Sequence, residues 1–229
     1  MEHHYYFLVE ALSELGLGHF AHAFSHVLHS WLVMVTLIAG ALLLTRKIEL
    51  IPGKGQSLLE MIVERLENFM LEITGPEGKA FFPFIGTAFL YILFSNLLGL
   101  VPGFMSPTAN LNTTLSLALC TFGLTHVIGV KYHGVKYIKH FLGPAWPLAP
   151  LMLIIEIIGH FARVMSLSIR LFGNIFGKEK IIGILFGLAG MYLAPLPLLF
   201  LGILVSFIQA LVFTLLSIIY FAGAMEEAH

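Results

Sequence analysis

An apolar stretch in the second half of the chain carries a row of polar residues at helical spacing. The steps between them are four, three, three, four, four and three residues, and the row comprises Glu156, His160, Arg163, Ser166, Arg170, Asn174 and Gly177. At about 100° per residue these positions share one face of a helix. The row places a permanently charged guanidinium group among carboxyl and imidazole groups that can bind and release protons.

If this stretch spans a membrane, Arg170 is its costly residue. A charge at the centre of a bilayer costs about 2.5–3.5 kcal/mol or more, and arginine does not deprotonate. On the same helix, Glu156 is fourteen residues away, about 21 Å along the axis, and Glu179 lies on the opposite face. We therefore predict that the counter-charge of Arg170 belongs to another protein. The alternative is an ion pair within the chain that locks the helices together.

The composition indicates an integral membrane protein. Of the 229 residues, 58% are hydrophobic and only 11% are charged, whereas soluble domains are about a quarter charged. The formal net charge of −1 argues against nucleic acid as a partner. A single cysteine, Cys120, excludes a disulfide framework and a thiolate metal site, and no motif indicates a cofactor.

Five stretches are long and apolar enough to cross about 30 Å of hydrocarbon. They cover residues 27–45, 81–101, 111–130, 148–188 and 196–224. We predict an all-α membrane protein that forms a single membrane domain over residues 1–229. The fourth stretch is about twice as long as a span needs and contains no proline between 151 and 194. We expect it to be one long tilted helix, paired with the last span.

Small residues accompany the polar row on the fourth stretch. Gly159, Ala162, Ser166 and Gly173 form a strip that would let a neighbouring helix approach closely.

Between the first two spans, residues 56–74 place apolar side chains on one face and glutamates on another. We predict an amphipathic helix on the membrane surface, which serves either as a connector or as a docking site.

The distribution of basic residues predicts the orientation. Residues 1–45 and 187–229 contain no Lys or Arg, whereas five lie between 46 and 79 and three between 131 and 139. By the positive-inside rule, the N-terminal segment 1–26 lies outside and the C-terminus is cytoplasmic. We predict no cleaved signal peptide and find no internal repeat of the kind many transporters have.

Two further sets of polar residues fall on helical faces. The last span carries a weaker stripe of Gly202, Ser206, Gln209, Ser217 and Tyr220. Near the N-terminus, four histidines share a face at spacings of three, four and three, namely His19, His22, His26 and His29. Such a face can ligate zinc. Because no carboxylate or cysteine accompanies the histidines, we favour an interfacial face and predict no metal site.

Four motifs carry a resemblance to a known family. They are NLLGLVPG at 96–103, PTANLNTTLSLAL at 107–119, EIIGHFARVMSLSIRLFGN at 156–174 and QALVFTLLSIIYFAGAMEEAH at 209–229. In this order and spacing, the sequence resembles the a subunit of F-type ATP synthases over nearly the whole chain. The resemblance implies a stator subunit in the inner membrane of a bacterium, surrounded by lipid. Its partners would be the c-subunit ring and the b-subunit peripheral stalk, and it would not itself perform the chemistry of ATP.

The resemblance also implies roles for single residues. Arg170 would be the essential arginine that faces the ring carboxylates and separates two proton half-channels. Glu179 would belong to the outer half-channel, on a water path between the last two helices, and Gln209 would lie beside Arg170. The cytoplasmic path would involve Glu156, Ser166, Asn174 and His160, and further candidates are Lys178, Ser206 and Tyr220.

Three positions depart from the family's pattern. Some members have a histidine where this chain has Gly202, and others have a glycine where it has Lys178. Glu179 would then act with water or another side chain, and Lys178 is placed to pair with it or shield it. Val164 replaces a common proline, which favours an unbroken helix.

Two functions of other classes compete with the stator. A stand-alone ion channel or secondary transporter would use Arg170 to bind an anionic substrate, but the chain lacks a repeat and a discontinuous helix pair. The second competing function is that of a membrane scaffold that holds an enzyme complex and transports nothing itself. For a stator, the choice between H⁺ and Na⁺ and the number of ring subunits would be set by the ring and not by this chain.

Overall fold

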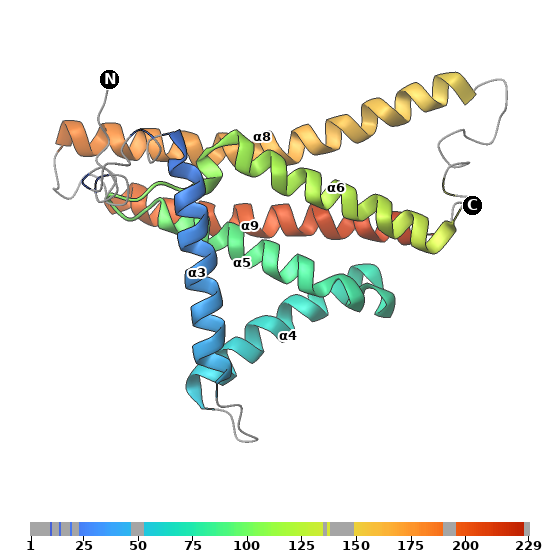
Figure 1. Cartoon of the computed structure of the whole chain (residues 1–229), viewed down its shortest axis with the longest axis horizontal. Helices are drawn as coiled ribbons and strands as arrows, with labels where there is room; N and C mark the ends of the chain where they lie inside the picture. The colour runs from blue at the N-terminus through green and yellow to red at the C-terminus, as the bar shows by residue number, and fades with distance from the viewer. Residues whose placement is uncertain are drawn as a thin grey trace.

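The computed structural model describes residues 10, 14, 19, 23–46, 53–134, 137, 149–189 and 196–226. Within these residues every regular element is a helix (Figure 1). In chain order the elements are α3 (Ser25–Thr45), α4 (Lys54–Thr74), the 3₁₀ helix η1 (Pro76–Phe81), α5 (Phe82–Leu98), the 3₁₀ helix η2 (Pro107–Ala109), α6 (Leu111–His133), α8 (Ala149–Ala189) and α9 (Leu196–Met225). Five of the helices are long and apolar enough to cross a membrane. The prediction of an all-α, multi-pass membrane protein is confirmed.

The fourth span is a single helix, as predicted. α8 runs for 41 residues, which is about 60 Å of helix and about twice the thickness of the hydrocarbon layer. A helix of this length in a bilayer must lie strongly tilted. Figure 1 shows α8 and α9 running alongside each other on the left of the view, while α3 crosses the long axis of the other helices.

The core lies where α5, α6, α8 and α9 meet. α6 packs against both α8 and α9, and α5 packs along α9. The buried side of α8 contributes Val164, Leu167, Leu171 and Ile175, which recur at steps of three or four residues. Four long helices therefore bury one stripe each and leave their other sides to the membrane.

The second span ends earlier than predicted. We expected it to reach Val101, but α5 stops at Leu98 and a turn follows. Pro102 disfavours helical backbone at the residue before it, and Gly103 has a φ of 88°. This difference is three residues, and the other predicted helix ends also differ from those of the structure by at most three.

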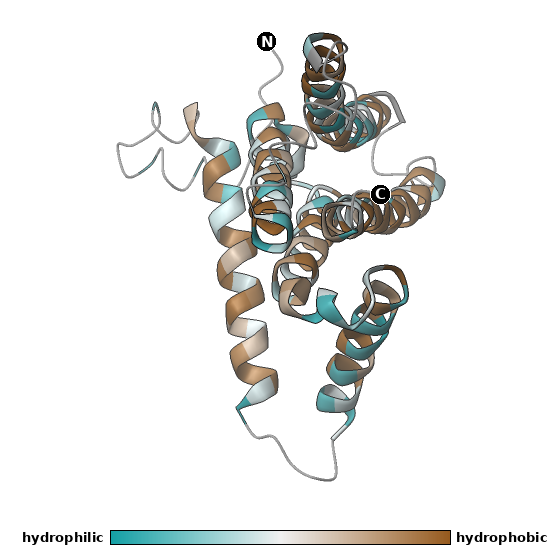
Figure 2. Ribbon diagram, turned by 90° about the vertical axis from the view of Figure 1, so that its right-hand side faces the viewer, coloured by the Kyte–Doolittle hydropathy of each residue, from teal (hydrophilic) through white to brown (hydrophobic). Residues whose placement is uncertain are grey.

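Helix α4 is amphipathic, as its sequence indicates. Its C-terminal half packs on the bundle through Met70, which is buried with Ile218 and Phe221 of α9. Its first half leaves Leu58 and Met61 at least half exposed. Figure 2 shows that α4 carries more hydrophilic residues than the mostly hydrophobic membrane helices.

Phe221 is the aromatic centre of the contact between α9, α5 and α4, and its loss tests the fold. Its ring meets those of Phe81 and Phe84 at centroid distances of 6.1 and 6.0 Å. We expect Phe221→Ala to destabilise the subunit by about 3–5 kcal/mol. Thermal unfolding of the detergent-solubilised protein would measure the loss. The matched control is Phe200→Ala on the same helix, where the side chain is 75% exposed; equal destabilisation by both would contradict this packing.

Candidate functional site

The side of α8 that points away from the bundle carries Arg170. Arg170, Ser166 and Gly173 are all exposed, on the side opposite the buried stripe of α8. A Cβ atom added at Gly159, Gly173 or Gly177 would meet no atom within 4 Å. The predicted strip of small residues therefore lines an open face, which has room for a helix from outside the chain.

Arg170 has no counter-charge in the part of the chain that the structure describes. No hydrogen bond, ion pair or aromatic contact joins its guanidinium group to another described residue. The two carboxylates of α8 are engaged elsewhere: Glu156 contacts His160, and Glu179 contacts Ser106. The positive charge of Arg170 is thus presented on the open face.

Glu179 points to a different side of α8, toward the connection between α5 and α6. One carboxylate oxygen, Oε1, accepts a hydrogen bond from the backbone N–H of Ser106 at 2.6 Å. The side chain lines a cavity of about 350 Å³, bounded mainly by residues 99–105 and by α8. We expected a water path between the last two helices, but no residue of α9 lines this cavity.

Gly99 is required by the close approach of this connection to α8. A Cβ atom at this position would collide with the carboxylate of Glu179 and would lie 2.7 Å from Cβ of Ser106. Glu179 therefore fits between α8 and the connection only because residue 99 has no side chain.

Lys178 lies next to Glu179 in sequence but points into the bundle. Its ammonium group donates to the backbone oxygen of Asn96 at 3.1 Å and to Oγ of Ser206 at 3.0 Å. Within the described residues, no ion pair joins it to Glu179. The cation is thus held by polar groups at the end of α5 and on α9, not by the neighbouring carboxylate.

A buried polar network surrounds these two residues. The hydroxyl of Ser106 donates to the backbone oxygen of Ser95 at 2.8 Å, and Thr108 donates to Oδ1 of Asn96 at 2.5 Å. Asn96 in turn donates to the backbone oxygen of Ser206 at 3.4 Å. All of these side chains are buried. We did not predict Ser106 and Thr108 as site residues; the signal was a pair of hydroxyl residues that flank a proline at the end of an apolar span.

One turn from Arg170, α8 and α9 are joined by an amide pair. The side-chain nitrogen of Asn174 donates to Oε1 of Gln209 at 2.8 Å. Gln209 is buried, whereas Asn174 is exposed at the edge of the open face. Gln209 of α9 therefore lies against α8 about one helical turn from Arg170, and Asn174 is the residue of α8 that it contacts.

A second cavity lies toward the other end of α8. It has a volume of about 340 Å³ and is lined by Glu156, His160 and Arg163 of α8, by Tyr220 of α9 and by residues of α6 and the following connection. His160 Nε2 is 3.2 Å from Oε1 of Glu156, and Arg163 lies over the ring of Tyr220 at 5.8 Å.

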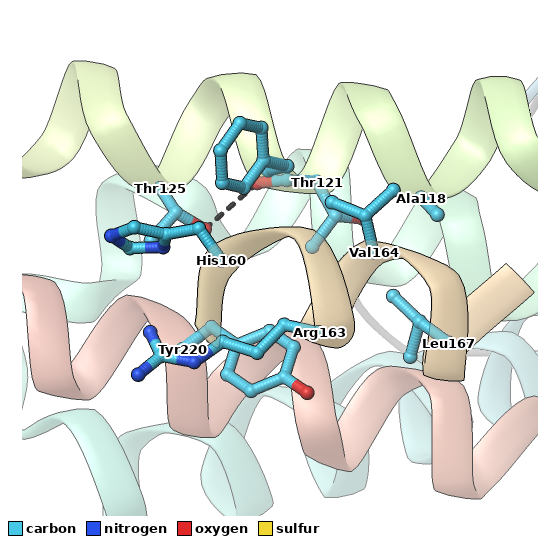
Figure 3. Close-up of a pocket in the computed structure, with 9 residues that line it drawn as sticks. Ala118, Thr121, Thr125, His160, Arg163, Val164, Leu167 and Tyr220 are labelled. Atoms are coloured by element: carbon cyan, nitrogen blue, oxygen red, sulfur yellow. Dashed lines mark hydrogen bonds between the residues drawn. The ribbon is translucent and has the colours of Figure 1, made fainter. Parts of the chain in front are cut away.

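A void of about 10 Å³ extends this second cavity deeper along α8. It lies between α6, α8 and α9, with His160 directed toward α6 and Arg163 toward Tyr220 (Figure 3). This volume is about what one water molecule needs. Hydroxyls of Thr121 and Thr125 line it, and the dashed line in Figure 3 marks the bond of Thr125 to the backbone oxygen of Thr121.

Comparison with known proteins decides the family. A family profile described as ATP synthase A chain matches residues 27–222. The chain belongs to this family. Members named ATP synthase subunit a include proteins from Desulfosudis oleivorans, which is 55% identical over the whole of both chains, and Desulfotalea psychrophila, which is 50% identical over the whole of both. A third, from Syntrophobacter fumaroxidans, is 56% identical over 89% of this chain and 85% of its own.

The resemblance inferred from the sequence is therefore confirmed, and the chain is a multi-pass membrane protein of the ATP synthase A chain family, a stator component of the proton channel.

The structure brings the candidate site residues together in two groups. Glu156, His160 and Tyr220 line one cavity, while Lys178, Glu179 and Ser206 lie near the other, with Asn174 and Gln209 between it and Arg170. Ser166 and Arg170 stand on the open face.

The histidine face has no metal arrangement among the described residues. His22 lies outside those residues. His29 is fully buried, its Nδ1 is 2.7 Å from the backbone oxygen of Ser25, and its ring meets Phe104 edge-on. This histidine packs α3 against the connection that also borders the Glu179 cavity.

The departure at Gly202 has a steric explanation. A Cβ atom on Gly202 would lie 2.6 Å from Cδ2 of Leu100 and 3.4 Å from Cδ of Lys178. Leu100, and beside it the long side chain of Lys178, thus lie in the space that a histidine at position 202 would need. In this chain the lysine and the glycine are therefore complementary.

This complementarity predicts the outcome of exchanging the pair. We expect Gly202→His alone to reduce the amount of assembled ATP synthase in the membrane, because its imidazole collides with Leu100 and Lys178. Adding Lys178→Gly should restore part of the assembly, since it opens space beside Leu100 into which the imidazole and the leucine side chain can move. Immunoblots of purified membranes would measure the subunit, with Lys178→Gly alone as the control. A double variant as poorly assembled as Gly202→His would contradict the steric account.

Proposed function

We propose that this chain carries two proton half-channels, separated by Arg170, and passes protons to and from the carboxylates of a c-subunit ring. The observation that carries the proposal is the arrangement along α8. Arg170 lies on the open face without a counter-charge among the described residues, and cavities of about 350 and 340 Å³ lie on either side of it along the helix.

The spacing along α8 supports two separate paths. Glu179 is nine residues beyond Arg170 and Glu156 fourteen residues before it, which is about 13 and 21 Å along the axis. Each cavity contains one of these carboxylates and borders a different end of the bundle. Protons could therefore reach the open face from two sides without crossing the core cluster around Leu171.

Arg170 acts on the ring by charge. Beside a fixed guanidinium group, a ring carboxylate favours its ionised form and gives up its proton. An ionised carboxylate cannot turn into the lipid because desolvation costs too much, whereas a protonated one can. Each ring subunit must therefore lose a proton to one half-channel before it passes Arg170 and gain one from the other half-channel before it leaves. Arg170 also prevents protons from passing directly between the half-channels.

The membrane potential supplies the driving force, about 2.3 kcal/mol per charge for every 100 mV. Ring rotation in one direction drives ATP synthesis in the catalytic head, and ATP hydrolysis there drives rotation and proton pumping in reverse. With the N-terminus outside, the Glu179 cavity opens to the outside and the Glu156 cavity to the cytoplasm of a bacterium. The b-subunit stalk would hold this chain still against the ring.

A substitution at Arg170 tests this function directly. We expect Arg170→Ala to abolish proton-driven ATP synthesis and ATP-driven proton pumping, and to leave assembly largely intact because the side chain contacts no described residue. Fluorescence quenching of a pH dye in inverted vesicles would measure pumping. Arg65→Ala, which removes an exposed arginine on α4, is the control. Normal pumping by Arg170→Ala would disprove the proposed function.

A second prediction concerns the Glu179 half-channel. Glu179→Gln keeps the size of the side chain and an acceptor for Ser106, but it removes the titratable group. We expect it to slow proton pumping by about tenfold without loss of ring binding. Copurification of the ring would check binding, and Glu64→Gln on the exposed side of α4 is the control. Unchanged pumping would mean that another group carries protons through this cavity.

A further inference from the structure

Four groups that can bear protons lie in contact with one another, in a row at the Glu156 cavity. Tyr137, after α6, has its hydroxyl 2.8 Å from Nδ1 of His126 on α6. The rings of His126 and His160 are 4.9 Å apart, centre to centre, and His160 contacts Glu156 at 3.2 Å. The row thus leads from the connection after α6, across α6, to the carboxylate on α8.

The row is held by close packing. Gly129 leaves room for the phenol ring of Tyr137, because an added Cβ atom would collide with the ring in its present position. The ring of Phe122 meets His126 edge-on at 4.2 Å and His160 at 5.5 Å. α6 therefore supplies one histidine of the row together with the surfaces that orient its neighbours.

Charges around the row suit proton transfer. Tyr137, Glu156 and His160 line the cavity, with Arg163 of α8 and Tyr220 of α9 facing them. Burial, together with the negative charge of Glu156, raises the pKa of the Tyr137 phenol, which Arg163 partly opposes. Tyr137 therefore rests in its protonated form, and its hydroxyl can donate a hydrogen bond to Nδ1 of His126, which would then carry its own hydrogen on the other ring nitrogen.

We propose that His126 and Tyr137 are members of a proton relay that links the connection after α6 to His160 and Glu156 in the half-channel. Tyr137 passes its proton to His126 and regains one from water at the connection. In each histidine one imidazole nitrogen binds a proton while the other releases one, so the ring returns to the neutral form with its tautomer exchanged. Glu156 accepts the proton from His160 and releases it to water in the cavity. The relay rests on the proposed half-channel function. A purely structural contact that fixes the connection to α6 is the alternative.

His126→Phe tests the relay, because phenylalanine keeps an aromatic ring against Phe122 but has no nitrogen to carry a proton. We expect ATP-driven pumping in inverted vesicles, and passive proton conduction after removal of the catalytic head, to fall by about tenfold or more. Tyr137→Phe should have a smaller effect in the same direction. The control is His133→Phe on the same helix, which removes only the contact of His133 with the backbone oxygen of Ala224.

Chemical rescue separates a relay from a structural contact. His126→Ala should also be slow, and added imidazole should restore conduction, because imidazole can enter the space beside the cavity and carry protons as the lost side chain did. Rescue should increase with the fraction of neutral imidazole as the pH rises. Normal conduction by His126→Phe, or slow conduction by His126→Ala that imidazole does not restore, would overturn the relay.

Arg170→Ala in the same assay distinguishes the relay from the function on which it rests. If Arg170→Ala pumps normally, the half-channel function itself is wrong. If Arg170→Ala is inactive and His126→Phe conducts at the normal rate, the half-channel function stands and protons reach Glu156 without His126.

Discussion

An uncompensated positive charge on an apolar helix is the constraint on which the rest of this structure depends. Arg170 cannot deprotonate, and no described residue neutralises it. Such a charge is tolerable in a membrane only where a partner of opposite charge can come close. The open strip of small residues on α8 provides that access, while the opposite side of the helix is buried by α6 and α9. The length of α8 lets one helix carry this open face near its middle and a cavity toward each end.

The polar groups within the bundle stabilise a different charged residue, Lys178. Lys178 is a second charge at membrane depth, and it is satisfied by a backbone oxygen and a hydroxyl rather than by the carboxylate beside it. This leaves Glu179 free to face its cavity, with one hydrogen bond from the backbone of Ser106. Gly202 of α9 has no side chain, and the side chain of Lys178 and that of Leu100 lie close to it, so the space between α8 and α9 is filled from α8 and from the turn after α5.

The two cavities differ in what surrounds them. The Glu179 cavity is bounded by the turn after α5, where Gly99 allows the close approach and Gly103 has a positive φ. Backbone without helical hydrogen bonds lies here against protein, where neighbouring polar groups satisfy it. The Glu156 cavity is instead lined mainly by helical residues of α8 and α9, together with Thr125 of α6 and Tyr137. Titratable groups are accordingly denser there, and they include the row of Tyr137, His126, His160 and Glu156.

The sequence by itself determined the membrane class, the five spans, the unbroken α8 and the row that contains Arg170, because each depends on local hydrophobicity and on helical periodicity within one segment. The same periodicity correctly put Glu179 on a different face from Arg170. Only the tertiary structure decided what each face meets. The contact of Glu179 with Ser106 spans 73 residues of sequence and that of Asn174 with Gln209 spans 35, and the packing of His126 against His160 joins two different helices. Contacts of this kind depend on how far each helix is rotated and displaced against its neighbours, which no pattern within a single helix specifies.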